Sequence, residues 1–401
     1  MKRRILFVME SLRIGGAEKS LVTILSRLSQ EPEWEIELLL FQPSGDFISY
    51  LPRNVRLLRL PEAAMRMFGD PKLLFDDLLF FLRCGQPHLA FARLAYFVCL
   101  AWHKCILRRE YIGWRWIRKA MSQLPGRYDT AISFLEKKTA YFVIERVNAA
   151  KKIVWIHIDY RHIEYDAKLD QWAFALADKL VAVSAACRER LLELFHLPPE
   201  KVCVIPNMVD RALIRSMSLE STAISPVEGR LVLATVARLT AQKGIDIAVD
   251  ACAALKRSGV SVLWLVVGDG EEYLPLQRKI AACGLSGDML LLGAKSNPYP
   301  YMRLADIYVQ PSRFEGFGIT IAEAKALEKP IIAADIPAFH ELLQNRQNAL
   351  LVPLDGASIA EAIQELHQDS EMRSRFIKTL GAETDEPGSS PYQAIRELLA
   401  S

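Results

Sequence analysis

Residues 231–246 read LVLATVARLTAQKGID, and this stretch decides the fold of the second half of the chain. Six of its first seven residues are apolar, without the alternation of a strand that has one face in water. Such a short, continuous apolar run is typical of a parallel strand covered by helices on both faces. Arg238 follows the run directly, and Lys243 follows five residues later, just before Gly244. Because open α/β sheets bind ligands beyond the carboxyl ends of their strands, both cations are candidates for a ligand site.

Apolar runs of the same kind recur along the chain and alternate with amphipathic helical patterns. They lie at 5–9, 36–41, 55–60, 130–134, 153–158, 180–183, 231–237, 262–267, 289–292, 307–309, 331–334 and 349–352. Strands that alternate with helical patterns of about 10–15 residues indicate doubly wound units with parallel sheets. The sequence therefore predicts an α/β protein with two Rossmann-like, doubly wound domains.

Chain length and breaker residues indicate where the domains meet. A chain of 401 residues is too long for one ordinary core and suits two domains of about 150–200 residues. The Ile-Pro-Asn stretch at 205–207 interrupts regular structure, because proline fixes φ. We therefore expect domains at 1–207 and 208–380, the first with a helical insertion at about 61–125. The tail at 381–401 ends in a helical pattern that we expect to pack back on the first domain.

Charge, cysteine usage and apolar segments exclude several classes of protein. The net charge of +3 is too small to argue for nucleic acid as a partner. The seven cysteines are odd in number and form no CxxC pair, which favours reduced thiols and gives no sign of a structural metal site. The apolar run after the basic amino terminus is shorter than the roughly 7–15 residues of a signal peptide, and the run at 94–102 is too short to span a bilayer. We therefore expect a cytoplasmic protein.

Residues 81–119 differ from the rest of the chain in charge and aromatic content. Eight Lys or Arg residues accompany a single acid, Glu110, and eight aromatic residues are interleaved with them. Basic and aromatic side chains on a helix suit the interface between water and anionic lipid, which predicts peripheral contact with the inner face of the cell membrane. The alternative is an ordinary insertion that packs on its own domain.

A second stretch with polar residues, at 311–324, reads PSRFEGFGITIAEA and follows the apolar run at 307–309. Its glycines free backbone N–H groups at the start of a helix, a natural site for oxygen-rich groups. Glu323 falls in the apolar first turns of that helix, where a carboxylate is costly unless partners such as ribose or hexose hydroxyls satisfy it. The alternative is that Glu323 faces solvent and that Glu315 caps the helix N-terminus.

Arg238 and Lys243, the two cations of the first stretch, suit a ligand that carries phosphate groups. An arginine fork together with a lysine point charge suits a diphosphate whose negative charge grows as it leaves. Alone, Arg238 and Lys243 would more often be solvated loop residues.

The two stretches together resemble a known family. The pairing of Ala-Arg-Leu-x4-Lys-Gly with Glu-Gly-Phe-Gly-x4-Glu is similar to that of the large retaining glycosyltransferase family 4, of GT-B fold. The family's Glu-x7-Glu element corresponds to Glu315 and Glu323, with its spacing intact. The resemblance covers nearly the whole chain and is weakest at 61–125 and after 370. It implies two Rossmann-like domains that face each other across a cleft.

The resemblance implies a role for each matching residue of the second half. Arg238 and Lys243 would bind the donor diphosphate and stabilise the departing nucleotide. Glu323 would hold the ribose hydroxyls, and Glu315 a hydroxyl of the donor sugar. The remaining donor-binding positions act through their main chain and are Gly316, Phe317 and Gly318 at the sugar and phosphates, Gly268 and Gly270 beside the nucleotide, and the stretch Gly293 to Lys295 at the base.

In the first half, the family is matched at Gly15 and Gly16, at His157, at Ser184 and at Asn207. Gly15 and Gly16 look like its N-terminal glycine loop, near the phosphates and the acceptor. His157 matches the family histidine that approaches the donor sugar, although a lone histidine at a strand end is more often a satisfied core residue. Asn207 also matches, but the next residue is commonly glycine in the family and is Met208 here, which leaves the role of Asn207 open.

The resemblance predicts transfer of a hexosyl unit from a nucleoside diphosphate sugar, UDP- or GDP-linked, with retention of configuration. The acceptor would be a hydroxyl of a lipid-linked or cell-envelope glycan. No Asp-x-Asp element is present, which fits transfer without a metal or any cofactor beyond the donor. The expected catalytic residues are His157, Arg238, Lys243 and Glu315, with His157 and Glu315 positioning the sugar.

Other functions are less consistent with the sequence. A non-catalytic GT-B subunit that only binds lipid or partner proteins would be expected to lose the cations or the glutamates, and all four are present. A dinucleotide-dependent oxidoreductase needs Gly-x-Gly-x-x-Gly directly after a strand, whereas the run at 5–9 leads through a loop to Gly15 and Gly16. A soluble small-molecule acceptor remains an alternative to a lipid-linked one.

Overall fold

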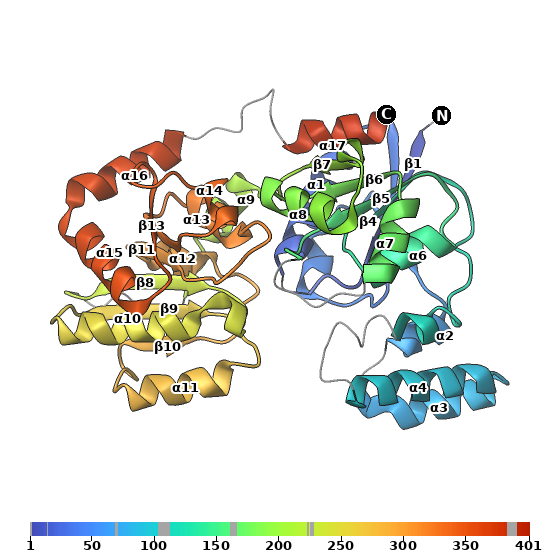
Figure 1. Ribbon diagram of the computed structural model, residues 1–401, viewed down its shortest axis with the longest axis horizontal. Helices are drawn as coiled ribbons and strands as arrows, with labels where there is room; N and C mark the ends of the chain where they lie inside the picture. Colours follow the sequence, from blue (N-terminus) through green and yellow to red (C-terminus); the bar gives the residue numbers. More distant parts are fainter. Residues whose placement is uncertain are drawn as a thin grey trace. The chain divides into compact units, whose positions relative to one another are not determined.

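The computed structural model describes residues 2–13, 15–68, 71–102, 113–160, 167–222, 224, 228–382 and 391–401. The chain forms two compact units, Met1–Met208 with Pro391–Ser401, and Val209–Ser390 (Figure 1). The division falls between Met208 and Val209, and the C-terminal residues return to the first unit.

The first unit is built on a seven-stranded sheet of order β3-β2-β1-β4-β5-β6-β7, in which all neighbouring strands are parallel. Five successive residues of the inner strand β1, Ile5 to Met9, are buried, so both faces of the sheet are covered. The strands are β1 (Arg3–Met9), β2 (Trp34–Leu40), β3 (Arg56–Arg59), β4 (Tyr128–Ser133), β5 (Ala149–Ile156), β6 (Lys179–Ala182) and β7 (Val202–Val204).

Helices surround this sheet, and one of them comes from the C-terminus. Arg3 and Lys151 donate hydrogen bonds to the carbonyls of Leu399 and Leu398, over 2.9 and 2.7 Å, and so cap the end of that last helix. The helices are α1 (Gly16–Leu28), η1 (Asp46–Tyr50), α2 (Glu62–Met67), η2 (Pro71–Leu73), α3 (Leu74–Arg83), α4 (Pro87–Trp102), α6 (Lys138–Arg146), α7 (Ala167–Leu176), α8 (Ala185–Phe195), η3 (Pro199–Lys201) and α17 (Pro391–Ala400).

The second unit has a six-stranded parallel sheet of order β10-β9-β8-β11-β12-β13. Its strands are β8 (Leu231–Val236), β9 (Val262–Val267), β10 (Met289–Leu291), β11 (Ile307–Gln310), β12 (Ile331–Ala334) and β13 (Ala349–Val352). Its helices are α9 (Arg211–Met217), η4 (Ala241–Lys243), α10 (Ile245–Arg257), α11 (Tyr273–Ala282), α12 (Tyr299–Leu304), α13 (Ile319–Ala326), α14 (Pro337–His340), α15 (Gly356–Gln368) and α16 (Ser370–Ala382).

Each face of the second sheet has its own hydrophobic core. Leu231 and Leu233 pack into the core that contains α10 and α15, whereas Val232 and Ala234 pack into the core that contains α12 and α13. Successive residues of β8 thus point to opposite, equally apolar faces. This explains why the strand reads as one continuous apolar run.

The prediction of two doubly wound α/β units is confirmed. Each of the twelve apolar runs overlaps a strand, and among the described residues β7 is the strand that the sequence pattern missed. The region between β3 and β4 is helical, with α2, α3 and α4, while 103–112 lie outside the described residues. Throughout the described ranges, no helix combines the length and the apolar character needed to cross a membrane.

Candidate functional site

The two polar stretches meet at one edge of the second sheet. Strands β8 and β11 are parallel neighbours, with Tyr308 opposite Ala234. Their carboxyl ends therefore lie at the same edge, where η4 follows β8 and the loop 311–318 leads from β11 into α13. This is the edge at which sheets of this class bind ligands.

Direct contacts tie the two loops together. The Arg313 amide donates to the carbonyl of Gln242 over 2.8 Å, and Gln242 Nε2 donates to the carbonyl of Phe314 over 2.9 Å. The Arg313 guanidinium also forms a bidentate ion pair with Asp246, at 2.7 and 2.8 Å. The loop geometry is therefore set by the protein itself.

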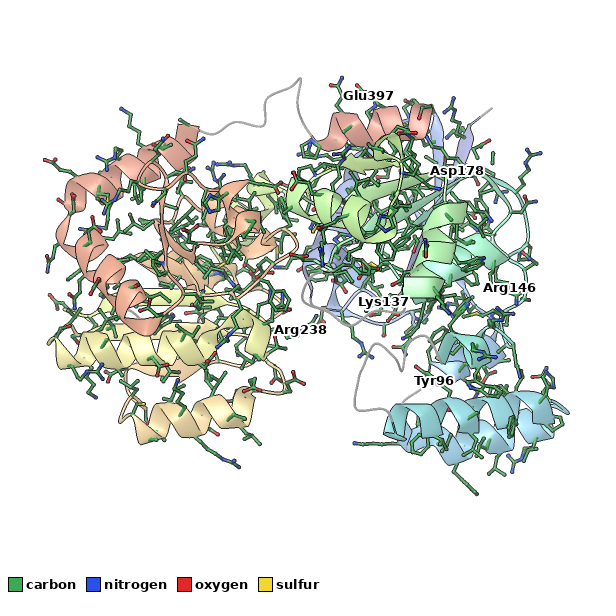
Figure 2. The ribbon with its side chains drawn as sticks, viewed as in Figure 1. Tyr96, Lys137, Arg146, Asp178, Arg238 and Glu397 are labelled. Carbon is green, nitrogen blue, oxygen red and sulfur yellow. The ribbon has the colours of Figure 1, made fainter. Side chains whose placement is uncertain are left out.

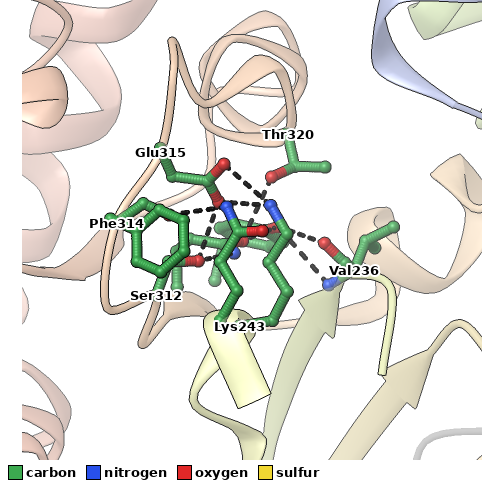
Figure 3. A network of polar contacts seen from close by, with 9 residues as sticks. Val236, Lys243, Ser312, Phe314, Glu315 and Thr320 are labelled. Atoms are coloured by element: carbon green, nitrogen blue, oxygen red, sulfur yellow. Dashed lines mark hydrogen bonds and ion pairs between the residues drawn. The ribbon is translucent and has the colours of Figure 1, made fainter. Parts of the chain in front are cut away.

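Lys243 and Glu315 form the central ion pair of this edge (Figure 3). Lys243 Nζ lies 2.6 Å from Oε1 and 2.7 Å from Oε2 of Glu315, whose side chain is only 9% exposed. The residue at the N-cap of α13 is Gly318, and the Glu315 carboxylate contacts Lys243 and Ser312 instead. Glu315 is therefore not the N-cap residue of this helix.

Glu323 is buried in the first turns of α13, with 1% of its surface exposed. Tyr299 Oη, from α12, donates a hydrogen bond to its Oε1 over 3.0 Å. The alternative of a solvent-facing Glu323 is therefore wrong. Tyr299 gave no signal in the sequence, because a buried tyrosine in an apolar helix looks like any core aromatic.

Glycines are needed where this edge is most tightly packed. Gly244 has φ +65°, and a β-carbon there would collide with the carbonyl oxygen of Pro311. Gly268 has φ +150° and lies equally close to the carbonyl of Ala237. Both positions therefore exclude larger residues on two grounds, backbone conformation and space.

The other predicted residues of the second unit follow the carboxyl ends of strands β8, β9, β10 and β11. Arg238 is exposed two residues after the end of β8, and no hydrogen bond or ion pair of its side chain is found in the described part of the chain (Figure 2). Gly270 packs against the carbonyl of Leu239, and Phe317 is buried. Lys295 is half-buried two residues after Gly293, whose carbonyl accepts a hydrogen bond from the Gly268 amide over 3.0 Å. Among the described residues, Arg238 is thus a cation without a counterion.

In the first unit, His157 follows β5. Its amide donates to Glu136 Oε2 over 3.0 Å, and its ring makes a hydrogen bond with the backbone of Phe134. Burial lowers the pKa of the imidazole to about 3, although the Phe134 bond acts in the opposite direction. Nε2 is buried, and within the described ranges it has no hydrogen-bond partner. His157 is therefore a neutral ring with one acceptor unused, and not a fully satisfied core residue.

The remaining predicted positions of the first unit are Gly15 and Gly16 at the start of α1, and Asn207 in the loop after β7. Gly15 precedes α1 at its N-cap, and Gly16 is the first residue of that helix. Asn207 has a buried Oδ1 that lacks a hydrogen-bond partner among the described residues. Met208 is buried, its amide donates to Ser20 Oγ over 3.1 Å, and its φ is negative. Glycine is therefore not required at 208, and the departure from the family pattern causes no backbone strain.

The structure thus divides the predicted residues between the units and brings Lys243 and Glu315 into contact. Gly15, Gly16, His157 and Asn207 belong to the first unit, and the others to the second. Three buried residues that the sequence reasoning missed, Tyr308, Gln310 and Ser312, lie next to the ion pair. In the part of the chain that the structure describes, no group of three or more His, Cys, Asp or Glu could hold a metal ion.

Family models match both units. The model described as Glycosyltransferase Family 4 matches residues 14–213, and the model described as Glycosyl transferases group 1 matches residues 219–380. The chain is a family 4 glycosyltransferase. The resemblance stated from the two motifs is thereby confirmed, together with the GT-B fold class.

Individual relatives of this glycosyltransferase agree with that assignment. Over 382 residues it is 25% identical to the N-acetylgalactosamine-N,N'-diacetylbacillosaminyl-diphospho-undecaprenol 4-alpha-N-acetylgalactosaminyltransferase of Campylobacter jejuni, covering 91% of this chain and 90% of that protein. It is 30% identical to the alpha-D-kanosaminyltransferase of Streptomyces kanamyceticus over 155 residues, 38% of this chain and 40% of that protein. The crystal structure of Anabaena HepE with UDP and glucose has the same fold, with a TM-score of 0.68 at 19% identity and 99% of each chain covered.

Proposed function

We propose that this glycosyltransferase moves a hexosyl unit from a nucleoside diphosphate sugar, UDP- or GDP-linked, to a hydroxyl group, with retention and without a metal ion. The observation that carries the proposal is the Lys243–Glu315 pair at the shared edge of β8 and β11. It combines a cation for phosphate oxygens with a carboxylate for sugar hydroxyls.

The first part of the mechanism is stabilisation of the leaving group. A transition state of oxocarbenium character needs the departing diphosphate stabilised more than it needs a strong base. Arg238 supplies a guanidinium that has no protein anion to give up within the described ranges. Lys243 supplies a second positive charge once its contact with Glu315 is partly exchanged for phosphate. Two cations can do the neutralising that a metal ion does in other transferases.

The second part is recognition of hydroxyl groups. Glu323 keeps a buried carboxylate that would accept hydrogen bonds from the ribose, and Glu315 would accept one from the donor sugar. Neither is assigned as a nucleophile, because the leaving phosphate can take the acceptor's proton on the same face. In the first unit, the unused Nε2 of neutral His157 is suited to accept a sugar hydroxyl.

The acceptor in this proposal is a lipid-linked glycan, reached through the α3–α4 hairpin. The name of the Campylobacter relative specifies a diphospho-undecaprenol acceptor. In Figure 1 helices α3 and α4 lie side by side beyond α2, away from the seven-stranded sheet. Large apolar side chains are exposed on both helices, and these are Phe75, Leu82, Phe91, Leu94 and Val98.

Aromatic and basic side chains continue this exposed apolar surface. The ring of Phe91, itself 61% exposed, packs edge-on against Trp116 with 5.5 Å between centroids, and Lys119 Nζ lies 4.3 Å from the centre of the Trp116 ring. Arg83 and Arg115 are exposed as well. Apolar rings with flanking cations suit an anionic bilayer, which is the occupant that we propose for this surface.

One part of the expected basic surface is corrected by the structure. Arg93 is fully buried, and its Nε donates to Asp77 Oδ2 over 3.0 Å. It therefore stabilises the α3–α4 hairpin from inside and cannot face lipid. Lys104, Arg108 and Arg109 lie outside the described residues.

A donor panel tests the catalytic proposal. Purified protein is incubated with UDP- and GDP-sugars, with and without a chelator, and released nucleotide is measured. We expect release from one sugar class, unaffected by chelation, and a product whose anomeric configuration by NMR matches the donor. Nucleotide binding without release from any donor would favour the non-catalytic subunit instead.

Vesicle binding tests the membrane proposal. Phe75→Ser and Phe91→Ser should each lower partitioning onto phosphatidylglycerol vesicles about 10- to 100-fold while donor hydrolysis is unchanged, because a buried aromatic ring contributes roughly 1.5–3 kcal/mol. Leu274→Ser, which removes an exposed apolar side chain from α11 of the second unit, is the matched control and should bind like wild type. Equal binding of all variants, or equal binding to phosphatidylcholine, would contradict the proposal.

A further inference from the structure

A row of buried or half-buried hydroxyl and amide groups leads from strand β11 to Glu315 (Figure 3). Ser312 Oγ donates to Glu315 Oε1 over 2.8 Å, and Gln310 Nε2 donates to Ser312 Oγ over 2.9 Å. Behind them, two hydroxyls donate to Gln310 Oε1, that of Tyr308 over 2.6 Å and that of Thr320 over 3.1 Å. We call Tyr308, Gln310, Ser312 and Thr320 the polar relay.

The order of donors and acceptors in the relay follows from the carboxylate at its end. A carboxylate can only accept, so Ser312 donates to Glu315. The Ser312 Oγ accepts from Nε2 of Gln310, which turns Oε1 toward the Tyr308 and Thr320 hydroxyls. Burial raises the pKa of Tyr308 well above its ordinary value, so its proton stays in place. Nε2 can only donate. The single proton of the Ser312 hydroxyl is therefore left for Glu315.

Glu315 needs the hydrogen bond from Ser312 because Lys243, its other partner, would also bind the donor diphosphate. Lys243 Nζ contacts both oxygens of the carboxylate. If it moves toward a diphosphate, a carboxylate that is only 9% exposed loses its counterion on at least one oxygen. A buried charge without hydrogen bonds is strongly unfavourable. The Ser312 hydroxyl keeps Oε1 satisfied and leaves Oε2 for a sugar hydroxyl.

We propose that the polar relay positions Glu315, so that one carboxylate oxygen accepts a donor-sugar hydroxyl while Lys243 turns to the diphosphate. This inference rests on the proposed function and assigns positioning residues within it. The relay residues act through Glu315 and need no contact with the donor. The competing interpretation is a purely structural network, which would contribute to folding and would not discriminate between a nucleotide and a nucleotide sugar.

The decisive variant is Ser312→Ala, which removes one hydroxyl and little volume. We expect kcat/KM for the nucleoside diphosphate sugar to fall about 10- to 100-fold, the equivalent of one charge-assisted hydrogen bond. The Kd of the nucleoside diphosphate alone should stay within about threefold, because Glu315 faces the sugar. Equal losses for nucleotide and nucleotide sugar, or no loss for either, would overturn the proposal.

Thr235→Val is the matched control. The Thr235 hydroxyl is buried in the neighbouring strand β8, donates to the carbonyl of Val309 over 2.7 Å and accepts from Trp264 Nε1 over 3.0 Å. Its removal breaks two buried hydrogen bonds, as Ser312→Ala does, but leaves the relay intact. We expect a similar drop in melting temperature with unchanged kinetics. If Thr235→Val lowered kcat/KM as much as Ser312→Ala, the effect would be one of general packing.

The far end of the relay gives a second test. Tyr308→Phe and Thr320→Val each leave one hydroxyl to hold the Gln310 amide, so each should cost about twofold in kcat/KM. The double variant lets the amide turn over and take the Ser312 proton, and should approach the loss seen in Ser312→Ala. A double variant that only multiplies the two small effects would contradict the proposed order of donors.

A double-mutant cycle measured by thermal unfolding tests the relay without any sugar donor. Ser312→Ala should lower the melting temperature in the wild-type background and lower it less in a Glu315→Ala background, because the bond to Glu315 is then already lost. Strictly additive shifts would overturn the relay. If no donor of the panel is turned over, the proposed function fails, and this cycle still decides whether Ser312 holds Glu315.

Discussion

Glu315 in the second unit differs from His157 and Asn207 in the first unit in whether the protein itself provides its hydrogen-bond partners. Lys243 contacts both carboxylate oxygens of Glu315, and Ser312 contacts one of them. By contrast, His157 Nε2 and Asn207 Oδ1 are buried without a hydrogen-bond partner in the described chain.

This difference separates two kinds of site. In the second unit, charged groups are held in place by the protein, so that removing one partner leaves a poorly solvated charge behind. In the first unit, the candidate groups are neutral, and removing one costs at most a hydrogen bond to substrate. We therefore expect the second unit to control donor use and the first to adjust it.

The largest effect is expected for Lys243→Ala. The change removes a cation from the diphosphate and leaves Glu315 with Ser312 as its remaining donor. We expect kcat/KM to fall about 10³-fold, in the range seen when one preorganised electrostatic contact is deleted. Nucleotide release over a range of donor concentrations measures it. Wild-type rates in this variant, with the fold verified by circular dichroism, would contradict the assignment of Lys243.

Next in size is Glu323→Gln, which keeps the shape of the side chain and removes its charge. We expect a loss of about 100-fold, mainly in KM, because a charged acceptor contributes roughly 1.5–3 kcal/mol to a hydrogen bond. Tyr299→Phe is the control, since it removes the tyrosine partner but leaves the carboxylate, and it should cost much less. Equal losses in the two variants would mean that Glu323 acts only as a structural group.

A buried acid of the first unit gives a prediction for stability. Burial raises the pKa of Asp170 to about 6, although hydrogen bonds from Tyr141 and Tyr160 favour its ionised form. The folded protein therefore holds this proton more tightly than the unfolded chain, and stability is lost as the pH rises from about 4 to 6. Asp170→Asn should be more stable than wild type at pH 7 by up to about 3 kcal/mol, and the gain should vanish below pH 4. Denaturant unfolding at both pH values measures this, and a gain independent of pH would contradict it.

The smallest effect is expected for His157→Ala. Because the pKa of the imidazole is lowered to about 3, the ring is neutral throughout the working range. A lost neutral hydrogen bond should reduce kcat/KM about tenfold and by the same factor at pH 5.5 and pH 8. A pH–rate profile of both proteins provides the check. A loss confined to one side of an inflection near the ordinary histidine pKa would show instead that the ring is charged in the reaction.

The fold was predictable because both sheets are buried on both faces. In β8 neighbouring residues enter different cores, so the strand carries no alternation and reads as one apolar block. Strand β7 was missed because Val202–Val204 has only three residues and lies at the sheet edge. The burial of Arg93 was also missed, since its partner Asp77 comes from the preceding helix of the hairpin. Sequence patterns do not reveal which distant acid a cation will meet.

The candidate site was predictable only in part. Glu323 stands out because a carboxylate in an apolar helix start needs a partner, and Glu315 stands out by the Glu-x7-Glu spacing. Tyr299 and Gln310 give no periodic signal, because a single polar tip does not change the pattern of its stretch. Ser312 stands inside the quoted motif, but its importance follows from its contact with Glu315, which depends on the conformation of the loop. Which polar groups become hydrogen-bond partners depends on the tertiary structure, and the sequence pattern does not show it.

The most direct test of the account is calorimetric binding of UDP, GDP and their sugars to wild type, Lys243→Ala and Glu315→Gln. We predict that Lys243→Ala weakens the binding of nucleotide and nucleotide sugar alike, because it removes a phosphate contact. Glu315→Gln should weaken only the additional affinity that the sugar provides. Unchanged binding in both variants would contradict the claim that the edge formed by β8 and β11 is the donor site.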